Sequence, residues 1–200
     1  LARPRPTETA VVLGLGPIGL ATVQTLRVEG VGRVIGVDVS PLRLALAERL
    51  GADVVVDASR ESTVERLQEL TGKGQSGYGG GSAGASADIV CECAGLPETL
   101  RDALQIVRRG GRLVVVALYE QLAEVDVNQL VIKELVVRGS FGYGAGGFTG
   151  FRDALALLAA GRVDSRPWLT HRFPLGAAAE AFRAQADRAS AVKVMLAPGA

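Results

Sequence analysis

The chain has 200 residues, of which 48% are hydrophobic and 22% are charged, and its formal net charge is +1. This length suits one domain, or one domain and part of another, with enough apolar residues for a core. The net charge is near zero and no basic stripe is present, so the charge pattern gives no support for nucleic-acid binding. No apolar run of about 18 residues is present that would span a membrane.

Two further features bear on where the protein works. Its two cysteines, Cys91 and Cys93, are too few for a disulfide framework and favour a reducing compartment, so we expect a cytoplasmic protein. The first nine residues contain no apolar signal region, and Leu1 stands where an initiator Met would be. We therefore expect the chain to be part of a longer protein.

The first predicted elements are a strand, a tight turn, a helix and a second strand. Apolar residues fill positions 10–13, an apolar face recurs with helical spacing over residues 17–29, and a second apolar run ends at Asp38. A strand, glycine turn, helix, strand and acid in this order form the first half of a dinucleotide-binding motif.

The turn has the sequence Gly-Leu-Gly-Pro-Ile-Gly. Gly14 allows the sharp turn, Gly16 leaves room for a pyrophosphate against the backbone, and Gly19 lets the helix pack closely on the strand. Pro17 suits the first helical position, and the amides at the helix start form an anion site. Asp38 lies 19 residues after Gly19, where a carboxylate would accept hydrogen bonds from an adenosine ribose. These residues predict dinucleotide binding, and a structural turn with a surface aspartate is the alternative.

Helices and strands then alternate along the chain. Ser62 and Glu65 have the spacing of a capping box at one helix start. The remaining elements of the predicted sheet are helices at 41–50, 63–71 and 97–108 and strands at 53–56, 88–93, 113–117 and 134–138. Short valine-rich strands that alternate with helices predict an α/β fold. We expect a doubly wound, six-stranded parallel sheet of the Rossmann type in the order 3-2-1-4-5-6.

A glycine- and serine-rich stretch interrupts this pattern. Residues 72–86 contain seven Gly and three Ser among fifteen positions. Such a composition cannot bury enough side chain to offset the ordering of its backbone. We predict a flexible, dispensable surface insertion over residues 73–86, with a phosphate-cradling loop as the alternative.

The pattern changes again beyond Gly139. Residues 142–147 form a hinge-like, glycine-rich run. It is followed by a predicted helix at 151–158, an irregular segment at 166–175, a helix at 177–186 and a strand at 192–196. We therefore divide the chain into a dinucleotide-binding Rossmann domain, residues 1–141, and a C-terminal segment, residues 142–200.

Short motifs along the chain carry a family resemblance. They are Gly14-Leu-Gly-Pro-Ile-Gly-Leu20, Asp38 with Ser40-Pro-Leu-Arg43, Leu50-Gly-Ala-Asp53, Cys91-Glu-Cys-Ala-Gly95, Gly110-Gly-Arg-Leu-Val114, Arg138-Gly-Ser-Phe141, Thr170-His-Arg-Phe-Pro174 and Lys193-Val-Met-Leu196. With these motifs the chain resembles the cofactor-binding half of the medium-chain, zinc-type alcohol dehydrogenases. The segment around Arg138 and the tail are most similar to the polyol and secondary-alcohol branch, such as sorbitol, butanediol and threonine dehydrogenases.

The resemblance implies that the cofactor is NAD and that its contacts carry over position by position. Amides near Pro17 and Ile18 would clasp the pyrophosphate. Asp38 would hold the adenosine ribose, with Arg43 beside it, and Lys193 would lie near the pyrophosphate. For Arg43 and Lys193 a solvated surface charge is the alternative.

The other end of the cofactor is implied to meet the ends of the fourth, fifth and sixth strands. The matching positions are Ala94, Gly95, Val116, Leu118, Ser140 and Gly142. By resemblance, the last four provide backbone contacts to the nicotinamide carboxamide.

In the family, the catalytic zinc ligands lie in an N-terminal domain that precedes this region. We therefore expect zinc only in that missing domain, with no metal ligand and no catalytic residue in this chain. Cys91 and Cys93 point to one face of a buried strand and lack partner ligands. His171, the only histidine, suits a proton shuttle, but the family uses this tail segment structurally.

The leading hypothesis is the NAD-binding domain of a zinc-type dehydrogenase, which moves hydride between NAD and an alcohol or ketone and is inactive as this chain alone. The alternative is a non-catalytic nucleotide-sensing module, and the sequence upstream of Leu1 would discriminate between the two. A short-chain dehydrogenase is excluded because Tyr78, Tyr119 and Tyr143 are not followed four residues later by lysine.

The sixth predicted strand also offers an assembly surface. Val131, Ile132, Leu135 and Val137 form an apolar edge, and an uncovered edge invites pairing. Family members continue the sheet across a twofold axis here, so the resemblance implies a homodimer.

Overall fold

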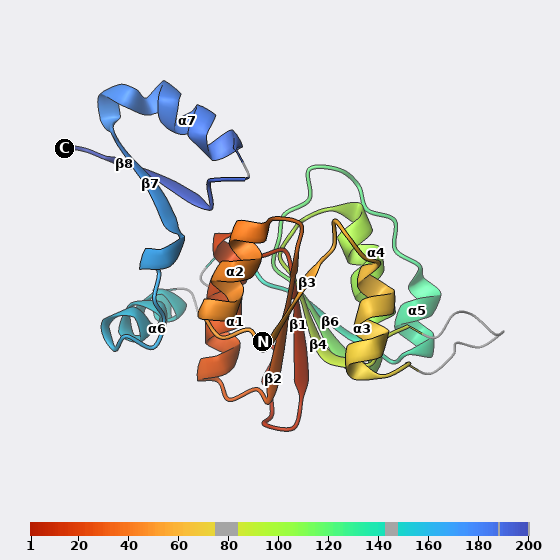
Figure 1. The fold of residues 1–200 in the computed structure, drawn as a ribbon. Helices are drawn as coiled ribbons and strands as arrows, with labels where there is room; N and C mark the ends of the chain where they lie inside the picture. The colour runs from red at the N-terminus through yellow and green to blue at the C-terminus, as the bar shows by residue number, and fades with distance from the viewer. Residues whose placement is uncertain (75–83, 143–147, 188, 200) are drawn as a thin grey trace.

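The structure is a computed structural model that describes residues 1–74, 84–142, 148–187 and 189–199. The strands of its main sheet are β1 (Thr9–Leu13), β2 (Arg33–Asp38), β3 (Val54–Asp57), β4 (Ala87–Glu92), β5 (Val107–Val115) and β6 (Val136–Gly139). They are all parallel, in the order β3-β2-β1-β4-β5-β6 (Figure 1). This confirms the predicted fold class and strand order. The order reverses between β1 and β4, which is where such sheets bind ligands.

The helices that connect these strands are α1 (Pro17–Val28), α2 (Pro41–Arg49), α3 (Thr63–Thr71), α4 (Pro97–Ile106) and α5 (Val127–Ile132). In Figure 1, α1 and α2 cover one face of the sheet, and α3, α4 and α5 cover the other. The Ser62 hydroxyl accepts a hydrogen bond from the Glu65 amide at 3.5 Å, which confirms the predicted cap of α3.

Alternate residues of the strands β1 to β5 enter two separate hydrophobic clusters. In β1, Ala10 and Val12 pack toward α1 and α2, whereas Val11 and Leu13 pack toward α3 and α4. This follows from the two-residue period of a strand. Because helices cover both faces, all four side chains are at most 1% exposed. Burial on both faces explains why the strands read as continuous apolar runs in the sequence.

The fifth strand begins earlier than the sequence predicts. The expected strand is 113–117, after a break at a glycine pair, whereas β5 already starts at Val107. Val107 pairs with Ala87, and the register then shifts. Gly110, with φ 66°, lies in the shifted stretch. The glycines therefore interrupt the ladder as an irregularity without ending the strand.

Most of the predicted flexible insertion, residues 75–83, lies outside the described residues. Its two ends are described and lie together between α3 and β4. Lys73 and Ala85 form an isolated antiparallel bridge, and the amide of Ser86 donates to the hydroxyl of Thr71 at 3.0 Å. The chain therefore leaves and re-enters the fold at one place.

The C-terminal segment builds a small unit of its own. It contains α6 (Phe148–Ala159), a 3₁₀ turn at Arg166–Trp168, β7 (Leu169–Pro174), a second 3₁₀ turn at Leu175–Ala177, α7 (Ala178–Ala186) and β8 (Lys193–Ala197). β7 and β8 pair in parallel and extend away from the main sheet (Figure 1). The prediction of an irregular segment at 166–175 is therefore wrong. The partner of β7 follows only after a helix, so no local pattern marks this strand. The hinge-like run falls largely on residues 143–147, outside the described residues.

The root of this tail is anchored to α1. Val163, Trp168 and Val192 are between 1% and 9% exposed and join the hydrophobic cluster under α1 and α2. In addition, the Gln24 side chain donates to the Asp164 carbonyl at 3.1 Å and accepts from the Asp164 amide at 2.8 Å. Burial and this paired hydrogen bond together fix where the tail leaves the sheet.

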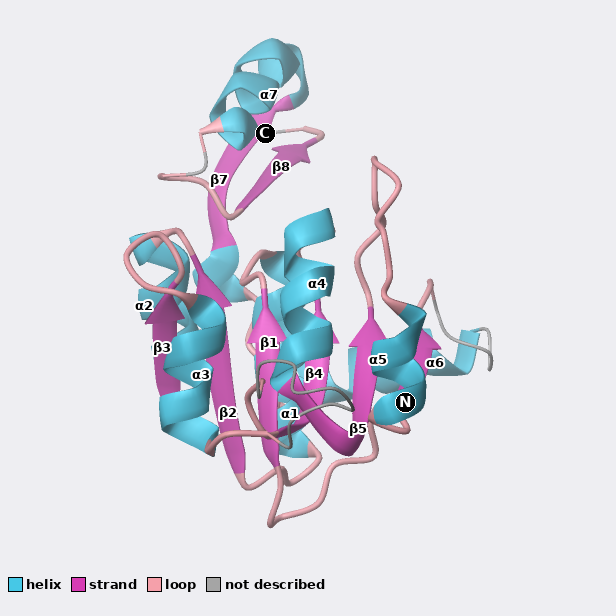
Figure 2. Ribbon diagram, turned by 90° about the vertical axis from the view of Figure 1, so that its right-hand side faces the viewer, coloured by secondary structure: helices cyan, strands magenta, loops and turns pink. Residues whose placement is uncertain are grey.

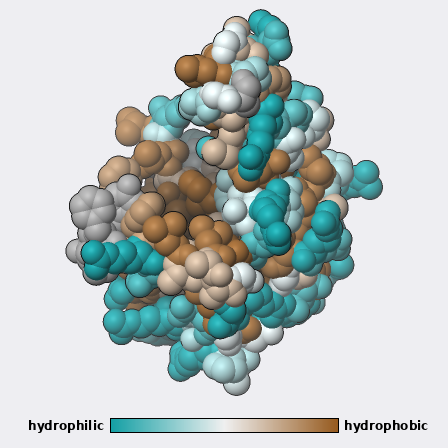
Figure 3. Space-filling model, turned by 90° about the vertical axis from the view of Figure 1, so that its left-hand side faces the viewer, coloured by the Kyte–Doolittle hydropathy of each residue, from teal (hydrophilic) through white to brown (hydrophobic). Residues whose placement is uncertain are grey.

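Beyond its root, the tail exposes apolar side chains. Figure 3 looks at the side of the molecule that carries α6 and the tail, and it shows hydrophobic surface gathered around a hollow. The exposed large apolar residues of this segment are Phe151, Leu155, Leu158, Leu175, Phe182 and Met195. An apolar gathering of this kind marks an interaction surface. No helix of the described residues is both long and apolar enough to cross a membrane.

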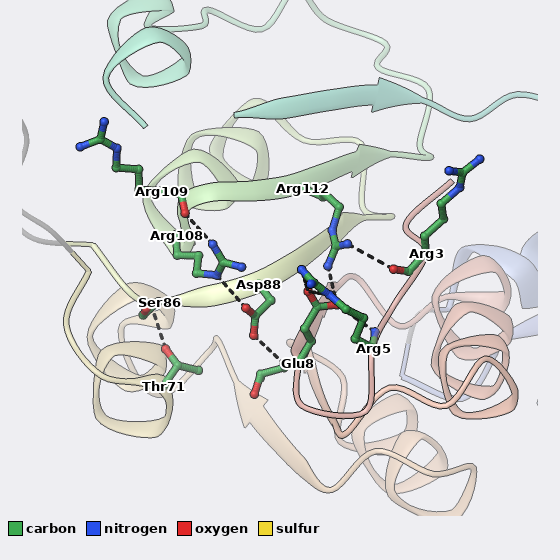
Figure 4. Close-up of polar contacts among 10 residues, drawn as sticks. Arg3, Arg5, Glu8, Thr71, Ser86, Asp88, Arg108, Arg109 and Arg112 are labelled. Atoms are coloured by element: carbon green, nitrogen blue, oxygen red, sulfur yellow. Dashed lines mark hydrogen bonds and ion pairs between the residues drawn. The ribbon is translucent and has the colours of Figure 1, made fainter. Parts of the chain in front are cut away.

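Charged side chains close the amino edge of the main sheet (Figure 4). Glu8 is 4% exposed and pairs with Arg5 and Arg112. Asp88 accepts from the amide of residue 9 at 2.8 Å and from Nε of Arg108 at 2.6 Å. Both carboxylates thus form ion pairs with arginines and accept hydrogen bonds from backbone amides. The network therefore ties the N-terminal segment to β4 and β5, at the edge opposite the one where such sheets bind ligands.

Candidate cofactor site at the carboxyl edge of the sheet

Three turns meet where β1, β4 and β5 end, at the edge toward which the strand arrows point in Figure 2. Gly14 has φ 85°, and a Cβ there would lie 2.8 Å from atoms of Ala94. Gly95 has φ 75°, and a Cβ there would lie 2.6 Å from the carbonyl oxygen of Leu118. Both positions need glycine for the backbone conformation and for the close approach. We call the joined turns, residues 14–16, 93–95 and 116–118, the carboxyl rim.

The remaining glycines of the first turn have different roles. A Cβ at Gly19 would collide with the carbonyl oxygen of Gly14, whereas no atom lies within 4 Å of the Cβ position of Gly16. Close packing within the protein therefore requires a glycine at position 19. At Gly16 it does not, and the space beside this backbone is free for a ligand. Gly16 is the N-cap of α1, and Pro17 is its first residue. Amides of the first turn, such as that of Ile18, have no acceptor within the helix and favour an anion.

Asp38 ties the end of β2 to the glycine-rich turn. Its Oδ2 atom accepts from the amide of Leu15 at 2.7 Å, and its Oδ1 atom accepts from the amides of Val39 and Ser40 at 2.8 and 2.9 Å. The side chain is largely buried, at 8% exposure. Each carboxylate oxygen can accept two hydrogen bonds, so a carboxylate that holds the turn can also accept from a ligand hydroxyl.

Arg43 projects from α2 toward the same carboxylate. Its Nη1 atom lies 3.9 Å from Oδ2 of Asp38. Within the described part of the chain, its Nε atom is buried without a hydrogen-bond partner. A guanidinium so placed balances the charge of Asp38.

Glu92 and Tyr119 join two turns of the carboxyl rim, and neither residue was predicted from the sequence to have a role. The Oε1 atom of Glu92 accepts from the amides of Ala94 and Gly95, at 2.9 and 3.0 Å, and from the Thr99 hydroxyl at 2.8 Å. Its Oε2 atom accepts from the hydroxyl of Tyr119 at 2.5 Å. The Glu92 side chain is fully buried. Its place at the end of a buried strand, within the Cys91–Gly95 motif, is the signal in the sequence that could have pointed to it.

The positions predicted to meet the nicotinamide lie at the ends of β5 and β6. The amide of Val116 donates to the carbonyl at the end of β4, and the amide of Ser140 donates to the carbonyl of Val115, both at 2.9 Å. Leu118 is 77% exposed on the carboxyl rim, and Gly142, with φ 56°, follows β6. These positions therefore follow neighbouring strands at one edge of the sheet.

Exposed apolar side chains accompany the polar groups of this edge. One follows each of the strands β1, β2, β4, β5 and β6: Ile18, Val39, Leu96, Leu118 and Phe141, which are 44% to 78% exposed. Apolar walls with a few fixed polar groups are typical of small-molecule sites. The edge therefore suits a ligand that combines flat rings with an anionic group.

Two predicted or considered residues lie in the tail and not on the carboxyl rim. Lys193 opens β8, and its carbonyl accepts from the Thr170 hydroxyl at 3.2 Å. The Nδ1 atom of His171 lies 3.0 Å from the same hydroxyl, and its ring stacks on Phe173. The contact of Lys193 therefore joins β8 to β7, and the contacts of His171 are with its neighbours in β7.

The described residues fit a dinucleotide but not a zinc ion. Among them, no three His, Cys, Asp or Glu side chains come together as a metal site would require. Burial raises the pKa of both thiols, that of Cys91 to about 12 and that of Cys93 further. Zinc binds thiolates, which this environment disfavours. A dinucleotide, by contrast, matches the open backbone at Gly16 and the carboxylate of Asp38.

A doubly wound parallel sheet with a glycine-rich turn at its switch point defines this domain as a Rossmann-like α/β domain. A family model described as zinc-binding dehydrogenase matches residues 17–160. The chain therefore belongs to the zinc-binding dehydrogenase family, which confirms the resemblance carried by its motifs.

Individual relatives agree with this membership. L-threonine 3-dehydrogenase of Bacillus velezensis is 35% identical over 168 residues, which are 84% of this chain and 45% of that protein. The crystal structure of 2R,3R-butanediol dehydrogenase from Bacillus subtilis matches with a TM-score of 0.81 at 32% identity, over 99% of this chain and 53% of that one. An alcohol dehydrogenase of Escherichia coli CFT073, solved in complex with NADH, matches with a TM-score of 0.82 at 26% identity, over 96% and 53% of the two chains. The chain thus spans about half the length of these relatives.

Proposed function

We propose that this chain is the NAD-binding domain of a zinc-type alcohol or polyol dehydrogenase and holds the nicotinamide for hydride transfer with an alcohol or ketone. One contact carries the proposal. The amide of Leu15, in the glycine-rich turn, donates to Oδ2 of Asp38 at 2.7 Å. The anion site at the start of α1 and a carboxylate suited to a ribose therefore lie side by side.

The proposed path of the cofactor follows the carboxyl edge of the sheet. The pyrophosphate lies against the open backbone of Gly16 and the first amides of α1. The adenosine ribose meets Asp38, with Arg43 beside it. The nicotinamide end then crosses Ala94 and Gly95 toward the ends of β5 and β6. NAD supplies the hydride acceptor, while these residues bind and orient it.

The relatives support the finer parts of this proposal. Their names specify dehydrogenation of threonine and butanediol, and one is solved with NADH. We propose that a complete protein containing this chain acts on an alcohol or ketone of that kind in the cytoplasm, with zinc held outside this chain. The two free cysteines, Cys91 and Cys93, suit such a reducing compartment.

Cofactor binding is tested by titration calorimetry of NADH into the 200-residue chain and its Gly16→Val variant. The Gly16 backbone is extended, at φ −62° and ψ −175°, and its Cβ position is open. Valine therefore leaves the fold intact but occupies the space of the pyrophosphate, and NADH binding weakens about tenfold or more.

The matched control is Gly176→Val, because the Cβ position of Gly176 in the tail is equally open. It leaves NADH affinity and the melting midpoint unchanged. A Gly16→Val variant that binds NADH as tightly as the original chain would exclude the proposed pyrophosphate position. No NADH binding by the original chain would overturn the proposed function.

We further expect this chain alone to reduce no NAD with any alcohol and to retain no stoichiometric zinc. Hydride transfer needs substrate held about 3–3.5 Å from the nicotinamide and a Lewis acid at the reacting oxygen. Metal analysis and an absorbance assay with a panel of alcohols and polyols test this. Stoichiometric zinc, or NAD reduction that disappears with a chelator, contradicts it.

A further inference from the structure

Glu92 holds two separate turns of the carboxyl rim with one buried side chain. At one end of the carboxylate, Oε1 accepts from the amides of Ala94 and Gly95 in the turn after β4. At the other end, Oε2 accepts from the hydroxyl of Tyr119, which follows β5. The backbone carbonyl of Glu92 also accepts from the amides of Val116 and Ala117, at 2.9 and 3.2 Å. Among the described residues, the Tyr119 hydrogen bond is therefore the side-chain contact that joins this carboxylate to the turn after β5.

The hydroxyl of Tyr119 is suited to act as a lasting donor. Burial, reinforced by the hydrogen bond to Glu92 and by its negative charge, raises the pKa of Tyr119. The hydroxyl therefore stays protonated across the physiological range. The ring packs against the cluster under α3 and α4, which fixes its direction. A protonated donor on a packed ring holds the turn after β5 at a defined distance from β4.

The two held turns lie on one side of the switch point. A dinucleotide in such a sheet lies across the point where the strand order reverses, here between β1 and β4. The acid suited to the adenosine ribose, Asp38, ends β2 on one side of that point. The nicotinamide half therefore lies on the other side, over β4 and β5, where Glu92 and Tyr119 are found.

We propose that Glu92 and Tyr119 are a positioning pair that holds the turns after β4 and β5 in the geometry that receives the nicotinamide half of the cofactor. The proposal rests on the proposed NAD-binding function. It assigns the pair no contact with the adenosine half, which Asp38 and the start of α1 receive.

The test compares NADH with ADP-ribose, which has the adenosine and both phosphates but lacks nicotinamide. Titration calorimetry measures both ligands on the original chain and on Tyr119→Phe. This variant removes one hydroxyl and keeps the packed ring. We expect NADH to bind roughly tenfold more weakly, as for the loss of a hydrogen bond to a charged group, while ADP-ribose affinity stays unchanged. A general loss of structure would weaken both ligands together.

Two variants of the same network serve as controls. Glu92→Gln keeps an acceptor for the Ala94 and Gly95 amides and offers an NH₂ group that can donate to the Tyr119 oxygen. The ratio of NADH affinity to ADP-ribose affinity should therefore stay close to that of the original chain. Thr99→Val removes a different donor to Glu92, at 2.8 Å, and leaves that ratio unchanged. Hydrogen exchange at residues 116–118, faster in Tyr119→Phe but not in Thr99→Val, reports the same effect without a ligand.

Each outcome decides between distinct statements. A change in the NADH to ADP-ribose ratio confined to Tyr119→Phe supports the positioning pair. An equal change for both ligands, or no change for either, overturns it while leaving the proposed NAD-binding function intact. If neither ligand binds the original chain, the proposed function fails and the role of the pair fails with it. If Tyr119→Phe does not fold, an affinity ratio for Glu92→Gln far from that of the original chain overturns the pair.

Discussion

At the residue scale, the Asp38 carboxylate accepts hydrogen bonds from three backbone amides in the ligand-free protein. It thereby fixes the glycine-rich turn through Leu15 and the entry to α2 through Ser40. The same carboxylate is the predicted partner of the adenosine ribose. Removing Asp38 therefore affects both the fold of the edge and its ligand preference, and an experiment at this position must measure both.

We predict that the chain prefers NAD to NADP. A 2′-phosphate would stand against Asp38, and like charges at ~4 Å cost on the order of 1–4 kcal/mol. NAD should therefore bind about tenfold or more tightly than NADP, and Asp38→Ala should narrow that gap. Titration calorimetry with both cofactors measures it, and the melting midpoint of Asp38→Ala is recorded for the lost amide contacts.

The control for this prediction is Asp57→Ala. Asp57 ends the neighbouring strand and is the register partner of Asp38, yet its own contacts are with Ser59 and Arg60. The Asp57→Ala variant should leave the ratio of NAD affinity to NADP affinity unchanged. Equal or tighter binding of NADP by the original chain contradicts the prediction.

A second residue-scale prediction concerns Glu8 and acid stability. Burial alone would raise the pKa of Glu8, but hydrogen bonds and charge from Arg112 and Arg5 outweigh it and hold the pKa below the ordinary 4.5. As the pH falls below about 5, the unfolded chain takes up this proton first, so the free energy of unfolding declines until the folded pKa is passed. Glu8→Gln should be less stable at pH 7 and should show a flatter decline between about pH 5 and pH 3.

Urea denaturation at a series of pH values measures this decline. Glu48→Gln, at an exposed position of α2, should keep the decline of the original chain. If the free energy of unfolding of Glu8→Gln declines with pH as steeply as that of the original chain, Glu8 does not contribute to the loss of stability in acid.

Single residues also show where sequence-based inference ends. The glycine turn and Asp38 could be predicted because strand, turn, helix and strand follow one another without interruption. Glu92 and Tyr119 could not, since they are 27 positions apart and meet only because β4 and β5 are neighbours. Their contact depends on side-chain direction at two strand ends, which no spacing in the sequence encodes. The predicted roles of the site residues as cofactor contacts stay predictions.

At the scale of elements, α4 depends on a lysine from outside the helix. The last carbonyls of a helix have no partner within it. The Nζ atom of Lys133 donates to the carbonyls of Leu104, Gln105 and Val107, at 2.6, 3.1 and 3.0 Å. One ammonium thus closes α4 and links it to the end of α5.

We predict that Lys133→Met lowers the free energy of unfolding by about 1–3 kcal/mol, because it leaves these buried carbonyls without their charged donor. Urea denaturation at pH 7 measures it, below the pKa of about 8 to which burial lowers Lys133. Arg109→Met is the control, since its ion pair with Glu134 is exposed and contributes little. A Lys133→Met variant as stable as this control would show that water replaces the ammonium.

Element boundaries and pairing differ in how well the sequence predicts them. The alternation of helices and strands over residues 9–139 was predictable because the central strands, such as β1 and β4, are buried on both faces and read as apolar runs. The early start of β5 was not, because its first residues pair across a shifted register. β7 was not predictable either, since it gains its partner only after α7. In both cases the missing information is the identity of the neighbouring strand.

At the scale of the whole molecule, β6 is an edge strand of the main sheet, and its residues are exposed in the described part of the chain. Val136 and Val137 are each 44% exposed, and Val131 is 70% exposed, whereas Leu135 packs inward against α4 and its neighbours. Of the four predicted edge residues, Val137 alone lies in β6. Val131 and Ile132 end α5, at 70% and 37% exposure, and Leu135 lies between the two elements and packs inward.

We predict a homodimer through β6, because an open apolar edge favours pairing with a second copy. Val137→Lys places a charge at that edge and should yield monomers in sedimentation velocity. Leu122→Lys, at a fully exposed position on the loop after β5, should leave the dimer intact. A monomeric original chain at high concentration contradicts the prediction.

The hydrogen bond from Leu15 to Asp38 has a consequence for the speed and cost of binding. Together with the Glu92 contacts, it orders the turns of the carboxyl rim in the free protein, so a ligand need not immobilise them itself. Preorganisation of this kind removes an entropic penalty from association. Cofactor capture at this edge is therefore expected to follow a single kinetic phase, with affinity differences among ligands expressed mainly in their dissociation rates.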